Sequence, residues 1–102
     1  MSYIDMLDVS VRDASFVSRD RMVKNARSLI QNTLVMVEAN DELRNTAVQT
    51  LDAVSTFSQL LTMTAAQQDV EAQRKLTREQ IDVLRKAIAN APRAALAEIL
   101  RL

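Results

Sequence analysis

The chain of 102 residues carries 13 basic and 13 acidic side chains, so its formal net charge is zero and gives no overall attraction to nucleic acid or anionic lipid. It contains no Gly, His or Cys. These absences exclude a glycine-rich phosphate loop, the usual zinc sites, a thiol nucleophile and an imidazole base. We therefore predict one globular domain over residues 1–102 that is not an enzyme and needs no metal and no cofactor.

The first nine residues mix apolar side chains with Asp5 and Asp8, and two interpretations are open. Ser2 can cap a short helix, whose positive N-terminal end would suit both acids. Alternatively, the segment is an arm that becomes ordered only on contact with a partner. No basic start followed by an apolar run is present, unlike in a secretory signal, so we expect a cytoplasmic protein.

A long helix is predicted from Ser10 to Ala39, because apolar residues recur every seven positions. These residues and their neighbours on the same face are Phe16, Val23, Ala26, Ile30, Thr33, Leu34 and Val37. The segment 38–42 predicts the first turn, where Asn40 tolerates the left-handed conformation that ends a helix and Asp41 can cap the next one.

The second helix contains the most charge-poor part of the chain, since Asp52 is the only charged residue in segment 45–68. Its predicted core face is Leu43, Ala47, Leu51, Val54, Phe57, Leu61 and Ala65. Many Ser, Thr and Gln side chains exclude a membrane span. Either this helix is central and covered on several sides by its own bundle, or Ala53, Leu60 and Met63 form a second stripe that contacts another chain.

A second turn is predicted at segment 76–81, where Thr77 and Gln80 form a capping box and Leu76 and Ile81 can pack across it. The third helix is then expected to begin at Thr77 and to continue through Pro92, either with a kink or with a restart capped by Asn90. The sequence thus predicts an all-α fold, in which an elongated up-down hairpin about 45 Å long packs with a Pro-kinked C-terminal helix as a three-helix bundle.

Five basic residues gather in the first predicted helix, namely Arg12, Arg19, Arg21, Lys24 and Arg27. They spread around more than half of its circumference, and Asp20 is spaced to pair with Lys24, as on a solvated face. The alternative is a strip that contacts nucleic-acid phosphates. Acidic pairs such as Asp41 with Glu42 lack the ligand density of a calcium loop and suit helix caps.

These features favour a protein–protein interaction module: a small helical adaptor, chaperone or assembly subunit. Its expected partner is a helix of another protein or a second copy of the chain. Elongated helical hairpins occur among bacterial secretion-system chaperones and phage assembly proteins, an analogy of architecture alone. A regulator that binds nucleic acid through the basic first helix is the alternative.

Overall fold

The computed structural model describes residues 2–91, and within this range all regular secondary structure is helical. The helices are α1 (Tyr3–Arg12), α2 (Arg19–Asn32), α3 (Leu34–Ala39), α4 (Asp41–Thr62) and α5 (Gln67–Ala89). The prediction of an all-α fold is confirmed. The predicted kink at Pro92 lies outside the described residues.

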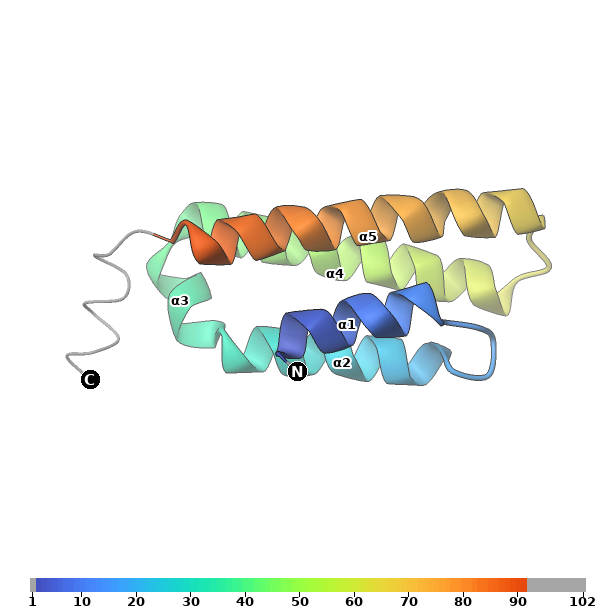
Figure 1. Ribbon diagram of the computed structural model, residues 1–102, viewed down its shortest axis with the longest axis horizontal. Helices are drawn as coiled ribbons and strands as arrows, with labels where there is room; N and C mark the ends of the chain where they lie inside the picture. Colours follow the sequence, from blue (N-terminus) through green and yellow to red (C-terminus); the bar gives the residue numbers. More distant parts are fainter. Residues whose placement is uncertain (1, 92–102) are drawn as a thin grey trace.

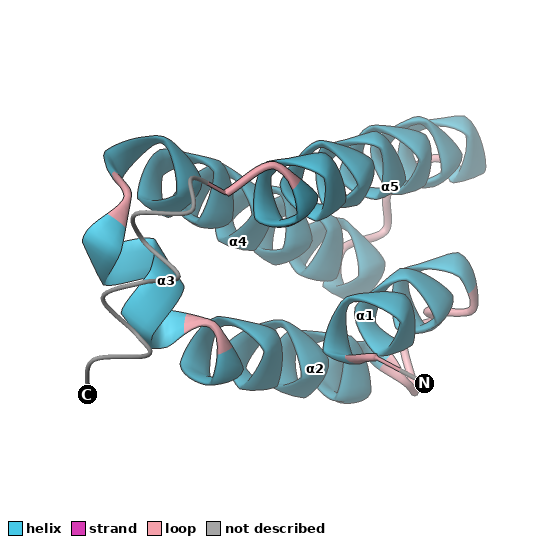
Figure 2. Ribbon diagram, turned by 60° about the vertical axis from the view of Figure 1, so that its left-hand side comes forward, coloured by secondary structure: helices cyan, strands magenta, loops and turns pink. Residues whose placement is uncertain are grey.

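The four longer helices form two antiparallel hairpins that pack side by side (Figures 1 and 2). Helix α1 packs against α2 and α5, α4 packs against α2 and α5, and the short α3 bridges the two hairpins. The molecule is elongated, with extents of 49, 19 and 19 Å. An up-down-up-down four-helix bundle therefore replaces the predicted three-helix bundle.

The predicted helix over 10–39 is wrong, because the chain reverses between α1 and α2. The backbone N–H of Ser15 donates to the hydroxyl of Ser18 at 2.9 Å, which closes the connecting loop over residues 13–18. The guanidinium of Arg74, on α5, donates to the carbonyls of Val11 and Arg12 at the end of α1 and to the carbonyl of Ala14 at the start of the loop. A contact from a distant helix thus stabilises the end of α1, and sequence periodicity carries no sign of it.

The seven-residue repeat consequently does not form one buried face. Phe16 lies in the loop with 57% of its surface exposed, and Leu34 is 46% exposed. The buried residues of α2 are Met22, Ala26 and Leu29. Helix α2 ends at Asn32, and Thr33 is its C-cap. The hydroxyl of Thr33 donates to two carbonyls of the preceding turn, and these bonds compete with the backbone bonds that would continue the helix.

The turn between α3 and α4 confirms the prediction for segment 38–42, although the caps differ from those expected. Asn40 is the N-cap of α4, where its side-chain oxygen accepts from the N–H of Leu43 at 3.2 Å. Its backbone is extended, with φ −142°, and not left-handed. Asp41 is the first residue of α4 and forms an ion pair with Arg44.

The second turn lies ten residues earlier than predicted, because α4 ends at Thr62 and α5 runs without interruption from Gln67 to Ala89. Thr77 is therefore not a cap. It is fully buried inside α5, and its hydroxyl bonds to the carbonyls of Gln73 (2.8 Å) and Ala53 (3.3 Å). The local capping signature fails because the helix already runs for ten residues before Thr77, so the N–H groups that a cap would serve bond to carbonyls of the preceding turn.

The core follows the bundle axis and draws apolar side chains from all five helices. Its members are Leu7, Val11, Ala14, Met22, Ala26, Leu29, Val37, Leu43, Ala47, Val54, Phe57, Val70, Ile81 and Leu84. Four of the seven positions predicted for the core face of the second helix are buried, and Leu51, Leu61 and Ala65 are half-buried. Among the described residues, every buried side-chain nitrogen and oxygen has a hydrogen-bond partner.

Helix α1 is the short N-terminal helix of the first interpretation, with Ser2 as its cap. The Ser2 hydroxyl accepts from the N–H of Asp5 at 3.3 Å. Two ion pairs then attach α1 to α5: Asp5 with Arg85, and Asp8 with Arg78 at 3.1 Å. The hydrogen bond from the Ser2 hydroxyl lowers the pKa of Asp5, and the bond from Arg85 lowers it further.

Candidate functional site

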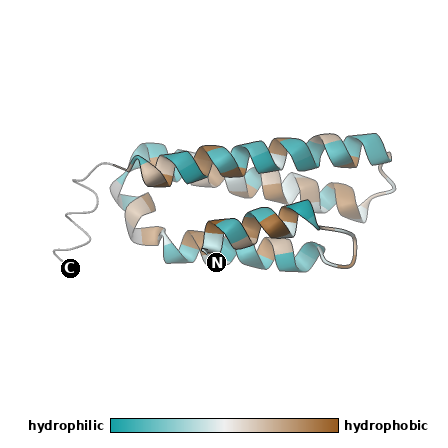
Figure 3. Ribbon diagram, in the orientation of Figure 1, coloured by the Kyte–Doolittle hydropathy of each residue, from teal (hydrophilic) through white to brown (hydrophobic). Residues whose placement is uncertain are grey.

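The end of the bundle that carries the α1–α2 and α4–α5 loops exposes large apolar side chains (Figure 1). Phe16 is 57% exposed, Val17 89% and Met63 64%. Phe16, Met63 and the half-buried Leu60 line a shallow depression of about 300 Å³. We call Phe16, Val17, Leu60 and Met63 the end patch. In Figure 3 part of this α1–α2 loop has the brown colour of hydrophobic residues.

Defined contacts hold the α1–α2 side of the end patch. The guanidinium of Arg19 lies 4.1 Å from the centroid of the Phe16 ring, a cation–π contact, and also donates to the carbonyl of Phe16. The hydroxyls of Ser15 and Ser18, on either side of Phe16 and Val17 in the sequence, are 3.2 Å apart and close the loop. Phe16 is therefore exposed in a loop that its own side chains stabilise.

The α4 side of the patch owes its exposure to the way in which that helix ends. Met63 has an extended backbone, with φ −93° and ψ 163°, while its N–H still bonds to the carbonyl of Gln59 at 3.2 Å. The chain thus leaves the helix at Met63. No residue between Ala53 and Gln68 is charged, so the surface next to Met63 offers hydroxyl, amide and apolar groups.

One cation, Arg74, also lines the depression, but its charge is already engaged. Its side chain is only 17% exposed, and its guanidinium lies 5.0 Å from the centroid of the Phe57 ring. It forms an ion pair with Glu71 at 3.0 Å and donates to the carbonyls at the end of α1. Arg74 therefore belongs to the scaffold beneath the end patch.

The three residues predicted to contact a partner lie in different surroundings. Ala53 is half-buried on the α5 side of α4, where its carbonyl accepts from Thr77. Leu60 and Met63 share the depression at the bundle end. Phe16 also lines the depression, and Val17 follows it in the same loop. Both were missed, because the seven-residue repeat assigned Phe16 to a packed seam. Their position between Ser15 and Ser18, residues that favour turns, was the available signal.

The five basic residues do not form one strip. Arg12 forms an ion pair with Asp13 at 3.0 Å, which raises the pKa of Arg12 and lowers that of Asp13. Arg19 is occupied by Phe16. Lys24 is exposed, Arg21 lines the cleft between α1 and α2, and Arg27 lines the groove between α2 and α4.

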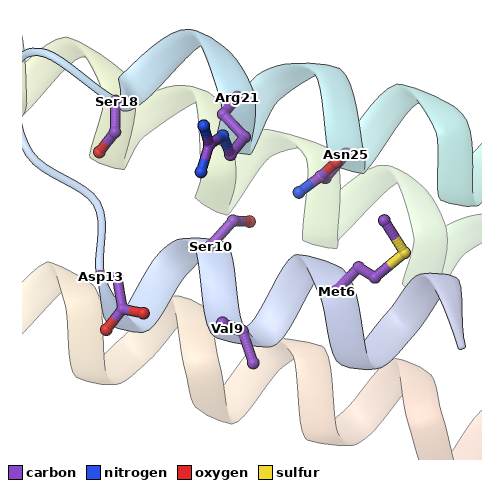
Figure 4. Close-up of a pocket in the computed structure, with 7 residues that line it drawn as sticks. All are labelled: Met6, Val9, Ser10, Asp13, Ser18, Arg21 and Asn25. Atoms are coloured by element: carbon purple, nitrogen blue, oxygen red, sulfur yellow. The ribbon is translucent and has the colours of Figure 1, made fainter. Parts of the chain in front are cut away.

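The cleft between α1 and α2 is the second candidate site, with a volume of about 240 Å³ (Figure 4). Helix α1 and the loop start contribute Met6, Val9, Ser10 and Asp13, and the loop end and α2 contribute Ser18, Arg21 and Asn25. In Figure 4 the side chains of Arg21 and Asn25 reach from α2 toward α1. The cleft thus combines aliphatic walls with hydrogen-bond donors.

The part of the chain that the structure describes contains no group of three or more His, Cys, Asp or Glu side chains arranged to hold a metal ion. None of its helices combines the length and the apolar character that crossing a membrane requires. Comparison of the chain with protein families, curated proteins and solved structures found no match.

Proposed function

We propose that this chain is a non-enzymatic protein-interaction module, a small helical adaptor, chaperone or assembly subunit, that binds its partner through the end patch. The observation that carries the proposal is the exposure of Phe16, Val17 and Met63, contributed by two loops at the same end of the bundle. Aromatic residues and Met are enriched where proteins contact one another. The contacts around Phe16 fix it in place, which lowers the entropy lost on binding.

The size of the patch favours a helix of another protein over a second copy as the occupant. The exposed fractions of these three side chains correspond to on the order of 400 Å², if each presents roughly 200 Å² when fully exposed. A standard interface buries about 800 Å² on each partner. Two bundles that meet only at their ends would not reach this area, whereas a helix lying across the patch also covers α4.

The surface of α4 next to the patch suits such a helix. Thr56, Gln59 and Thr62 are exposed there, and no charged residue lies between Ala53 and Gln68. Covering hydroxyl and amide groups that can form hydrogen bonds costs far less than removing a full charge from water. This is the charge-poor surface that the sequence offers for contact with a partner helix.

The nucleic-acid alternative has weaker support. Two of its five basic residues already form contacts within the chain: Arg12 pairs with Asp13, and Arg19 lies over the Phe16 ring. The remaining three divide between a cleft, a groove and open surface. Binding through phosphates would weaken steeply with added salt, whereas apolar packing would not.

The test is a pair of matched double variants, used to capture proteins from the native host in moderate and high salt. Val17→Glu with Met63→Glu places two charges in the end patch. Val48→Glu with Val83→Glu places two charges at exposed valines on α4 and α5, each 50% exposed, as the control. Circular dichroism and the melting temperature should stay close to wild type for both, because all four side chains are at least half exposed.

The proposal predicts that one protein partner binds wild type and the control equally, is retained in high salt, and is lost at least tenfold with the end-patch variant. Equal capture by both variants contradicts it. Recovery of nucleic acid that is released by salt supports the alternative. Light scattering of wild type should give the monomer mass, and a dimer separated by the end-patch variant would identify a second copy as the occupant.

A further inference from the structure

The α1–α2 cleft shares no lining residue with the end patch depression, and the proposed partner contact does not use it. A hollow of about 240 Å³ lies between its two helices. Met6 and Val9 form aliphatic wall on α1. Arg21 and Asn25, spaced four residues apart, lie on the same side of α2 and reach toward α1 (Figure 4).

The hydroxyl groups in the cleft are already engaged. Ser10 donates its hydroxyl to the carbonyl of Leu7 at 2.7 Å. The hydroxyl of Ser18 accepts from the N–H of Ser15. By contrast, the side chains of Arg21 and Asn25 form no hydrogen bond or ion pair within residues 2–91. The unengaged polar groups on α2 are thus a guanidinium and a carboxamide, both of which donate N–H groups.

The charge in the cleft selects among the ligands that such donors can hold. A guanidinium matches the two oxygens of a carboxylate with parallel hydrogen bonds. Asp13 also lines the cleft, and the hydrogen bond from Arg12 keeps it ionised by lowering its pKa. One cation beside one ionised carboxylate disfavours a doubly charged phosphate. The lining contains no aromatic side chain on which a flat ring would stack.

We propose that the α1–α2 cleft binds a monoanionic carboxylate attached to a short aliphatic chain. Arg21 and Asn25 hold the carboxylate, and Met6 and Val9 contact the aliphatic part. The same chemistry is offered by a free short-chain fatty acid and by the C-terminal residue of a peptide that ends in an aliphatic side chain. This inference does not depend on the function proposed for the end patch.

The experiment is an NMR titration of the full chain with sodium hexanoate, hexan-1-ol and N-acetyl-leucine, followed through the side-chain N–H signals of Arg21 and Asn25. Hexanoate should shift both signals saturably, with a dissociation constant on the order of millimolar for so small a ligand. Hexan-1-ol has the same chain without the charge and should shift them much less. Tighter binding of N-acetyl-leucine indicates a peptide end as the source, and tighter binding of hexanoate a free acid.

The matched variants are Arg21→Gln and Lys24→Gln, which remove one positive charge each from the exposed surface of α2. Only Arg21 lines the cleft. Arg21→Gln should weaken hexanoate binding at least tenfold, as read from the Asn25 signal, while Lys24→Gln should leave it within twofold. Unchanged backbone amide spectra establish that both variants are folded. Equal weakening by the two variants, shifts that do not saturate, or equal shifts with hexan-1-ol would overturn the proposal.

Discussion

The contact most specific to this fold joins Arg74 of α5 to the end of α1, and Arg74→Met is the sharpest test of it. The guanidinium donates to the carbonyls of Val11 at 2.7 Å, Arg12 at 3.0 Å and Ala14 at 3.1 Å. Methionine keeps much of the aliphatic volume but leaves these carbonyls without their donor.

The expected cost follows from what the guanidinium does. Hydrogen bonds to a charged group contribute about 1.5–3 kcal/mol each when they are partly buried, as at Val11 and Ala14. The bond to the exposed carbonyl of Arg12 contributes much less. Favourable interaction with the helix C-terminus adds about 0.5 kcal/mol, and the contact with the Phe57 ring about 0.5–1 kcal/mol. Because these terms overlap and Met gains some packing, we expect a net loss of about 3 kcal/mol.

Urea unfolding followed by circular dichroism measures this loss. With a slope of about 1.5 kcal/mol per M for a domain of this size, the midpoint should fall by about 2 M. Arg74→Lys should recover part of the loss, since an ammonium keeps the charge but lacks the planar fork. Arg85→Gln, which breaks a largely exposed ion pair, should cost less than about 1 kcal/mol. If Arg74→Met costs no more than Arg85→Gln, the reasoning is refuted.

Two other predictions concern buried and titrating groups. Thr77→Val should lower the free energy of unfolding by about 1–2 kcal/mol, because it removes the buried hydroxyl that bonds to Gln73 and Ala53. Thr56→Val, at an exposed position, should change the free energy of unfolding little. Equal effects of the two substitutions in urea unfolding would contradict this. The pKa of Asp5 is lower in the folded protein than its ordinary value of 3.8, so its stabilising effect is present above about pH 4 and is lost as pH falls through the folded pKa. Asp5→Asn should flatten the fall in melting temperature below pH 4, and an unchanged acid profile would argue against the bonds that Asp5 forms with the Ser2 hydroxyl and with Arg85.

The helical class and the first turn could be predicted because they depend on local chemistry. Absence of Gly and periodic apolar residues favour helices, and Asn40 caps α4 through a neighbour three residues away. The apolar positions from Leu43 to Phe57 were assigned to the core correctly, because they lie in one uninterrupted helix. Ser2 likewise caps α1 through the N–H of Asp5.

The remaining boundaries depend on contacts across the bundle, which periodicity does not contain. Arg74 bonds to the end of α1 from more than 60 residues away, and Thr77 lies buried against α4 inside a helix that begins ten residues earlier. For the same reason the candidate site was found only in part. Leu60 and Met63 stood out within a charge-poor segment, whereas Phe16 fitted a repeat that the loop at 13–18 interrupts.

The cyclic order of the helices has a consequence for how the chain folds. Most contacts join helices that follow one another along the chain or that only the short α3 separates. The contact between α1 and α5 differs, because it joins two helices that are far apart in the sequence and closes the ring. Local hairpins form quickly because little loop entropy is lost, and contacts between distant segments come at greater entropic cost. We therefore expect the α1–α5 contact to form last in folding and to open first. Amide exchange should find α1 less protected than the α4–α5 hairpin.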